Sequence, residues 1–160
     1  MDKKRFPKFY KQAVEKQKAD LYCVDLSGAY LKDANLKGAY LESANLCDTK
    51  LGGADLEDAN LYDADLCYAR LGGTNLKGAD LKDAKLRRAY LRGANLFHAD
   101  LSGADLRRAN LEGADLRRAD LEDANLEDAN LEDANLTGAM LRGQNLDDLK
   151  SRGTIIGYQD

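Results

Sequence analysis

The chain has 160 residues, of which 44% are hydrophobic and 32% charged, and its formal net charge is −4. These values predict one small soluble domain. Three cysteines do not make an extracellular disulfide framework, and a single histidine, His98, excludes a multi-histidine metal site. Because no apolar run is long enough for a secretory signal or a membrane span, we expect a cytoplasmic protein.

A short helix is predicted within residues 1–18, where Pro7 is acceptable in a first turn. Its apolar face has helical spacing and consists of Phe6, Tyr10, Ala13 and Val14. Residues 1–19 also carry seven Lys or Arg against two acids, so a basic arm for membranes or nucleic acid is the alternative. We prefer a helix that caps the repeats which follow, because the apolar face is short and a repeat stack needs a lid.

From Leu21 to Leu146 every fifth residue is leucine. On a helix, successive leucines would step by about 140° around the axis, and on a straight strand they would point alternately to opposite faces. The chain must therefore turn once in every repeat. The leucine and the residue two before it, usually alanine, are predicted to point inward, and the Asp or Asn between them outward.

The two residues after each leucine are predicted to form a corner. Glycine occupies the second corner position ten times, as at Gly28 and Gly38, and favours a turn with positive φ. Other corners carry Asp, Arg or Ser at that position, and we expect them to use a different turn type.

Residues outside the leucine frame recur at a spacing of twenty, which favours coils of four sides. Cys47 and Cys67 show this spacing, and so do the first members of two arginine pairs, Arg87 and Arg107. A third arginine pair, Arg117 with its neighbour, follows at ten, so coils of three sides stay open as the alternative.

The repeat Ala-[Asp/Asn]-Leu-x-x, as in "ADLED", "ANLKG" and "ANLEG", resembles that of the pentapeptide repeat family over about four fifths of the chain. The resemblance implies an all-β fold, a right-handed quadrilateral parallel β-helix of about six to seven coils. We therefore divide the chain into a cap helix at residues 1–18, the pentapeptide repeat β-helix at 19–148 and a C-terminal cap or tail at 149–160. The family implies no single function, but members resembling the quinolone-resistance proteins protect DNA gyrase by imitating duplex DNA.

The C-terminal segment departs from the repeat. Gln144 stands at an alanine position, Leu149 lies outside the leucine frame, and residues 154–158 form a short apolar run that would cap the last coil or pair with a second chain. The gyrase-protecting relatives are usually dimers joined at their C-terminal ends, often through a helix. No helix is predicted at this end, so a monomer and a dimer through an end cap both stay open.

Stacking by twenty gathers four arginines on one edge of the solenoid, and this arginine edge consists of Arg87, Arg88, Arg107 and Arg108. Glu127 and Asp128 come next along it, so we expect ion pairs between coils. One interpretation is a solvated ladder of weak ion pairs. The other is an anchoring patch for an acidic partner.

A second edge, the Phe97 cluster, consists of Phe97, His98, Arg117 and Arg118. An aromatic ring beside arginine is typical of an interaction hot spot, although single exposed aromatics are common on protein surfaces. Five tyrosines also point outward, where they would contact a partner or cover coil edges: Tyr30, Tyr40, Tyr62, Tyr68 and Tyr90.

Two further groups of residues are brought together by the spacing of twenty. Cys47 and Cys67 would lie on adjacent coils at a separation compatible with a disulfide; we expect reduced thiols and keep oxidation of this pair as a hypothesis. Carboxylate columns would collect a divalent cation or cap turns, and we expect turn capping. One such column is formed by Asp80, Asp100 and Asp120.

No catalytic constellation or phosphate-binding loop is visible, so we expect no enzyme, no cofactor and no metal. We predict a bacterial protein, of a kind abundant in cyanobacteria, that acts as a non-enzymatic protein–protein interaction scaffold through its outward columns. Its partner is unknown, and we expect no direct contact with nucleic acid or membrane. The alternative is a DNA mimic that binds gyrase: residues 20–80 and 119–148 carry net charges of −6 and −8, but residues 81–118 between them carry +4.

Overall fold

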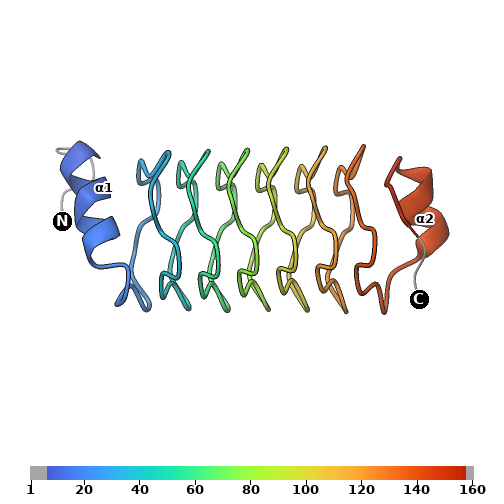
Figure 1. The fold of residues 1–160 in the computed structure, drawn as a ribbon, viewed down its shortest axis with the longest axis horizontal. Coiled ribbons are helices and arrows are strands. Elements are labelled where there is room, and N and C mark those ends of the chain that lie inside the picture. The colour runs from blue at the N-terminus through green and yellow to red at the C-terminus, as the bar shows by residue number, and fades with distance from the viewer. Residues whose placement is uncertain (1–6, 158–160) are drawn as a thin grey trace.

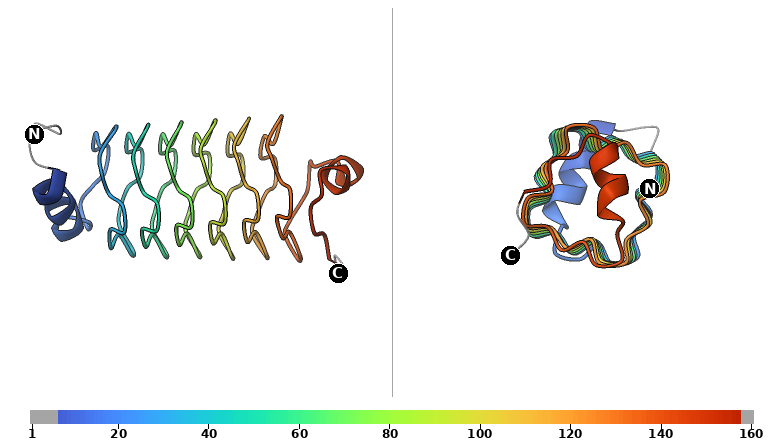
Figure 2. Two further views of the ribbon diagram at one scale, coloured as in Figure 1. Left: turned by 90° about the horizontal axis from the view of Figure 1, so that it is seen from above. Right: turned by 90° about the vertical axis from the view of Figure 1, so that its right-hand side faces the viewer.

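The computed structural model describes residues 7–157, and the side chains from residue 11 onward. Two short helices, α1 (Pro7–Lys16) and α2 (Leu146–Ser151), lie at opposite ends of a rod of stacked coils (Figure 1). Seen along the rod, successive coils superimpose on one four-cornered outline, with a helix over each end (Figure 2). The rod is therefore a solenoid closed by helical caps.

Each side of the solenoid pairs with the same side of the next coil through a single parallel β-bridge. The bridges run from Asp25↔Asn45 to Asn135↔Ile155, always between residues 20 apart. Within residues 7–157 they stay isolated and no continuous strand forms, because the corner takes two of the five residues in each repeat. The spacing of twenty seen in the sequence is thus the register of the coil.

The interior is a stack of leucine and alanine layers. From Leu21 to Leu141 every frame leucine is at most 7% exposed. Two threonines replace alanine in these layers and are also fully buried. The Thr49 hydroxyl donates a hydrogen bond of 3.0 Å to the Leu26 carbonyl oxygen, and Thr74 makes the corresponding bond. Threonine is accepted there because its polar atom has a partner.

All corners share one backbone conformation at their second residue. This residue has positive φ both where it is glycine, as at Gly28 (65°), and where it is not, as at Asp33 (54°) and Arg88 (58°). The expectation that corners without glycine use a conformation of their own is therefore wrong. The same ladder bond forms at both kinds of corner, for example from Asp33 N–H to the next coil, and offsets the strain of about 1–2 kcal/mol.

The outward Asp and Asn residues close these corners. The Asp100 Oδ1 atom accepts the backbone N–H of Ser102 at 2.9 Å, and Asp80 and Asp120 accept the N–H two residues later in the same way. Since this N–H points away from the coil-to-coil ladder, the carboxylate or amide oxygen supplies its partner. Turn capping, as expected, is what these columns do.

Helix α1 covers the open edge of the first coil. Val14 is buried against the leucine core. The Lys11 ammonium donates hydrogen bonds of 2.8 Å to the carbonyl oxygens of Lys32 and Asp33. The backbone N–H of Asn35 donates to Glu15 Oε1 at 2.7 Å. Helix α1 thus supplies hydrogen-bond partners to backbone groups of the first coil, which has no preceding coil to supply them. Phe6 lies outside the described residues, and the side chain of Tyr10 is not among those described.

A helix also closes the C-terminal end, so the prediction that this end lacks one is wrong. Asn145 Oδ1 accepts the N–H of Asp147, as in an ordinary corner, and also that of Asp148, so the chain continues as α2. Leu146 is consequently 40% exposed, while Leu149, outside the leucine frame, is buried in its place. Helix α2 spans residue 148, where we predicted the end of the repeat domain.

Side chains complete this second cap. The Gln144 amide donates to the Ala124 carbonyl oxygen at 2.7 Å, and the Arg152 guanidinium to the Leu126 carbonyl oxygen at 2.8 Å. After α2 the chain returns to the solenoid, where Ile155 pairs with Asn135. Tyr158, the last residue of the predicted apolar run, lies outside the described part of the chain.

Candidate partner-binding surfaces

The arginine edge lies on two neighbouring coils, as the spacing of twenty predicts. Its four guanidinium groups line a surface hollow of about 420 Å³, which they share with Tyr68, Glu127 and Asp128. Residues 88 and 108 have positive φ, and Arg87, Arg88 and Arg108 are exposed while Arg107 is partly buried. Basic side chains thus surround a depression that is open to solvent.

Two of these arginines are engaged by carboxylates. The Arg107 guanidinium makes a two-point ion pair with Asp105, at 2.8 Å and 2.7 Å, which holds the pKa of that carboxyl below its usual value. Arg108 Nε lies 3.3 Å from an Asp128 oxygen in the next coil. The expected ion pair between coils therefore forms for Arg108. Arg107 instead pairs within its own coil, because Asp105, two residues earlier, presents both oxygens to it.

The other two arginines form no ion pair within residues 7–157, although the charge of Arg87 helps to lower the pKa of Asp105. The Arg88 guanidinium lies over the Tyr68 ring, 5.7 Å from its centroid, and Nη1 is 3.4 Å from the phenol oxygen. The Arg87 guanidinium forms no hydrogen bond or ion pair there. Both are exposed, so this half of the edge can accept an anionic group from outside.

The Phe97 cluster is also assembled by the fold. The Arg117 guanidinium lies 5.5 Å from the centroid of the Phe97 ring, and the His98 ring meets the same ring edge-on at 4.6 Å. Asp115 holds Arg117 in place through two bonds of 2.8 Å and 2.6 Å, which lower the pKa of Asp115. Arg118 is exposed and forms no ion pair within the described residues.

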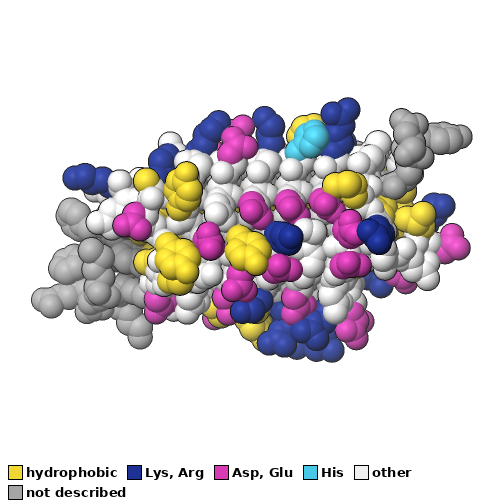
Figure 3. Space-filling model, turned by 90° about the horizontal axis from the view of Figure 1, so that it is seen from below, with side chains coloured by type: hydrophobic (Ala, Val, Ile, Leu, Met, Phe, Trp, Pro, Cys, Tyr) yellow, Lys and Arg dark blue, Asp and Glu magenta, His cyan; other side chains and the backbone are white. Residues whose placement is uncertain are grey.

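The two candidate surfaces occupy opposite corners of the solenoid. Phe97 follows Arg87 by ten residues, which is half of a coil. Figure 3 shows basic side chains at two opposite borders of one face, one group beside the histidine, with acidic side chains between them. The fold does not bring these surfaces together, and a flat partner cannot contact both at once.

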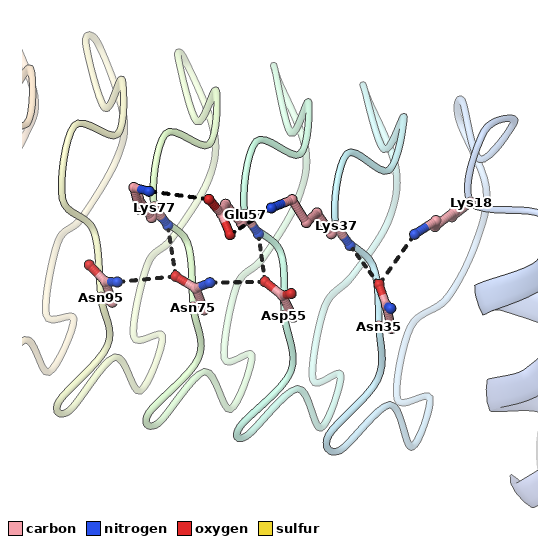
Figure 4. A network of polar contacts seen from close by, with 8 residues as sticks. All are labelled: Lys18, Asn35, Lys37, Asp55, Glu57, Asn75, Lys77 and Asn95. Atoms are coloured by element: carbon pink, nitrogen blue, oxygen red, sulfur yellow. Dashed lines mark hydrogen bonds and ion pairs between the residues drawn. The ribbon is translucent and has the colours of Figure 1, made fainter.

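Another face carries a polar ladder that sequence reasoning did not single out (Figure 4). The Asn95 amide donates to Asn75 at 3.1 Å, and the Asn75 amide donates to Asp55 at 2.9 Å. Beside this ladder Glu57 accepts from Lys37 and Lys77, and these bonds lower its pKa. Because these groups satisfy one another, the ladder joins coils and leaves little to bind a ligand. In the sequence, the recurrence of Asn or Asp at a spacing of twenty indicates this ladder.

Exposed aromatic rings gather nearer the N-terminal end. Tyr22, Tyr30 and Tyr40 are each about 60% exposed, whereas Tyr62, Tyr68 and Tyr90 are less so. Tyr22 was missing from the tyrosines predicted to point outward, although it follows Leu21 and so stands at the first corner position. The Tyr90 ring lies against Gly72, where a Cβ atom would meet ring carbons at 3.0 Å.

Cys47 and Cys67 are free thiols on neighbouring coils, next to the bridge Asn45↔Asp65. Burial, together with a hydrogen bond to Asp65, raises the pKa of Cys67 to about 11. Burial and the charge of Asp65 also raise the pKa of Cys47. Since the thiolate is the reactive form, both thiols are poor nucleophiles at neutral pH.

Among the described residues, no group of three or more His, Cys, Asp and Glu side chains is arranged to hold a metal ion. Neither α1 nor α2 is long and apolar enough to cross a membrane.

Comparison with known proteins identifies the repeat. The sequence profile described as "Pentapeptide repeats" matches eight copies, in segments that together extend over residues 19–148. The chain belongs to the pentapeptide repeat family. None of the curated proteins matches it.

Solved structures agree with this assignment. A pentapeptide repeat protein from the cyanobacterium Nostoc PCC 7120 is 41% identical, with a TM-score of 0.59, over 64% of this chain and 84% of that one. One from the cyanobacterium Cyanothece 51142 is 32% identical, with a TM-score of 0.55, over 71% of this chain. The match spans 64% of the length of the Cyanothece protein.

A plasmid-mediated fluoroquinolone resistance protein is also similar, with a TM-score of 0.50 over 83% of this chain and 79% of its own. Its 18% identity shows a shared fold alone. Together the family and these structures assign a right-handed β-helix solenoid to the pentapeptide repeat chain.

Proposed function

We propose that this pentapeptide repeat protein is a non-enzymatic scaffold of the bacterial cytoplasm that binds a protein partner through its outward columns. The observation that carries the proposal is the Phe97 cluster. There one aromatic ring contacts both the His98 ring and the Arg117 guanidinium, and Asp115 fixes that guanidinium in place.

Such a cluster has the chemistry of a binding anchor. Aromatic and arginine side chains dominate the energy of many interfaces. Because Asp115 already orders Arg117, binding there loses less side-chain entropy than binding to a free arginine would. A partner suited to it presents an apolar group for Phe97 and an acceptor for the exposed Arg118. The arginine edge, on the opposite corner, is suited to a separate acidic partner.

The test is capture by the immobilised protein from an extract of its source cell, followed by a dissociation constant measured with the purified captured protein. Replacing Phe97→Ala or Arg117→Ala should weaken that complex by at least about tenfold. Circular dichroism would verify that each variant keeps the fold.

The matched controls are Lys32→Ala and Lys82→Ala, exposed corner residues whose side chains form no ion pair within residues 7–157. They should leave the affinity unchanged. A complex equally tight for all four variants would place the binding site elsewhere, and failure to retain any protein would count against the scaffold.

A second candidate function is imitation of DNA toward gyrase. It is favoured by residues 119–148, which carry nine acids and one base on the outside of a rod. The test is a gyrase supercoiling assay with the protein titrated in, with and without a quinolone. Inhibition or protection from the drug would support this function, and an unchanged rate of supercoiling would remove it.

A further inference from the structure

Two of the four guanidinium groups that line the hollow of the arginine edge form no ion pair. Arg107 and Arg108 are each paired with an aspartate, at 2.7 Å and 3.3 Å. Arg87 and Arg88 form no ion pair within residues 7–157, and both are exposed. Because these two are neighbours in one corner, the hollow offers two positive charges together to an anion from outside.

Two arginines of this edge are held in place by neighbouring side chains. The Arg88 guanidinium lies over the Tyr68 ring, 5.7 Å from its centroid, with Nη1 3.4 Å from the phenol oxygen. Arg107 uses Nε and Nη2 for Asp105, and its Nη1 group forms no hydrogen bond within residues 7–157. A guanidinium that is already in place loses little side-chain entropy on binding, and its planar fork fits the oxygens of an oxyanion.

The basic stretch is short, because carboxylates border it at both ends along the rod. Backbone hydrogen bonds of 2.9–3.1 Å stack this corner from one coil to the next. Its second positions are, in order, Asp48, Tyr68, Arg88, Arg108 and Asp128. Nucleic acid carries a phosphate about every 3.4 Å along each strand, so a polyanion laid along this corner would meet carboxylates on both sides. The surroundings of the arginines therefore favour a compact anion.

A phosphate monoester suits the two unpaired arginines better than a carboxylate does. It carries a charge of about −1.5 to −2 at neutral pH and three acceptor oxygens, so it can bind both guanidinium groups at once. The hollow of about 420 Å³ is open, and Tyr68, Arg87 and Arg88 are exposed, whereas small-molecule sites enclose most of their ligand. These features favour a phosphate carried by a protein, whose surrounding surface supplies further contacts.

We propose that the arginine edge binds a phosphorylated side chain of a protein partner, with Arg87 and Arg88 as the principal ligands of the phosphate. The inference names the chemistry of the acidic partner, and so it rests on the arginine-edge part of the proposed function. It does not depend on the Phe97 cluster, which lies at the opposite corner. Capture through that cluster should be weakened by Phe97→Ala and kept in Arg87→Gln, so failure of one proposal is distinguishable from failure of the other.

Nuclear magnetic resonance of the full chain tests the site through the Nε–H signals of its arginines, assigned with Arg87→Lys and Arg88→Lys. The probe is a glycine pentapeptide with phosphoserine at its centre and both termini blocked, and the comparison peptide has glutamate there. The phosphopeptide should shift both signals and bind at least about tenfold more tightly than the glutamate peptide. Equal affinities, or signals that do not move at about 10 mM phosphopeptide, would overturn the proposal.

A double variant, Arg87→Gln with Arg88→Gln, should weaken phosphopeptide binding at least about tenfold. Its matched control is Lys32→Gln with Lys82→Gln, which makes the same change in net charge at exposed residues that do not line the hollow. The control should bind like the unmodified chain. An equal loss in both variants would mean attraction by net charge alone and would refute the site. Thermal unfolding would verify that both variants keep the fold.

Two further ligands test which source of phosphate the site accepts. Inorganic phosphate should bind no more tightly than the phosphopeptide. A short oligothymidylate should bind more weakly, because the carboxylates at both ends of the basic stretch repel its flanking phosphates. Tighter binding of inorganic phosphate would mean a site for the free ion, and tighter binding of the oligonucleotide would mean a site for nucleic acid. Either result would overturn the proposal.

Discussion

The Glu15 carboxylate of α1 accepts the backbone N–H of Asn35 at 2.7 Å and so replaces the coil that the first coil lacks. Removing this acceptor with Glu15→Ala leaves a backbone donor at the edge of the solenoid without its partner. We expect a loss of about 1–2 kcal/mol in the free energy of unfolding, measured by urea denaturation. Aggregation on heating should increase, because an uncovered edge can pair with another chain.

Glu15→Gln, which keeps an oxygen acceptor, should recover most of this stability. If Glu15→Ala matches the unmodified chain in both stability and aggregation, α1 covers the first coil without this bond.

The corner caps predict a difference between two similar substitutions. Asp100→Ala removes the oxygen that accepts the Ser102 N–H and should cost about 1 kcal/mol in the free energy of unfolding. Asp100→Asn keeps that oxygen and should cost far less, since Asn110 and Asn130 cap their own corners in this way. Equal costs for the two substitutions would mean that the charge of Asp100, rather than its hydrogen bond, stabilises the corner.

Corners without glycine hold conformational strain that can be released. Ser43 has a φ of 55°, and its side chain forms no hydrogen bond within residues 7–157, so none of that kind is lost on replacement. Ser43→Gly should raise the unfolding free energy by up to about 1 kcal/mol, because glycine adopts positive φ without steric cost. Ser43→Val should lower it, since a β-branched residue is disfavoured there. Thermal melting of the two variants in opposite directions would confirm the strain, and melting in one direction would argue against it.

The raised pKa of Cys67, about 11, predicts slow alkylation at neutral pH. The rate should increase about tenfold per pH unit from pH 8 to pH 10, in step with the thiolate fraction. Asp65→Asn removes the carboxylate that accepts the thiol hydrogen and should speed the reaction at pH 8. Mass spectrometry of the alkylated peptides distinguishes Cys67 from the exposed Cys23. Fast labelling of Cys67 at pH 7 would contradict its burial.

The same pKa has a consequence for stability. A thiol whose pKa is raised by folding stabilises the folded chain below the ordinary thiol pKa of about 9 and loses this contribution as pH rises to about 11. The free energy of unfolding should therefore fall across that range, and by less in Cys67→Ser.

The leucine frame could be interpreted from sequence because the same requirement, an apolar side chain buried inside the coil, recurs in every repeat. The inward leucine and the inward alanine follow from it, whereas the coil of twenty residues is indicated only by the recurrence of residues outside the frame, such as Cys47 and Cys67. The positive φ of Asp33 and Arg88 could not be predicted, since local preference disfavours it and only the ladder between coils imposes it. Helix α2 was missed because Asn145 and Asp147 look like one more corner until Asn145 also binds Asp148.

The candidate surfaces were predictable in composition and less so in detail. The spacing of twenty placed Arg87 beside Arg107. The spacing could not predict that Arg107 pairs with Asp105 and not with Glu127. Both carboxylates lie within reach of the Arg107 guanidinium, and only the geometry of the corner favours one of them. Tyr22 was missing from the tyrosines predicted to point outward because it follows Leu21, the first leucine of the frame.

The coil register of twenty also fixes what an insertion would do. Five extra residues that respect the leucine frame leave the core and every ladder bond possible, yet they advance all later residues by one side of the square. Placed after Arg88, such an insertion would move the Phe97 cluster to the next corner and carry Arg107 away from its place beside Arg87. The surface pattern of this solenoid can therefore change independently of its core. Whole repeats can be gained or lost without unfolding the chain, and each gain or loss brings different outward residues together on the surface that a partner contacts.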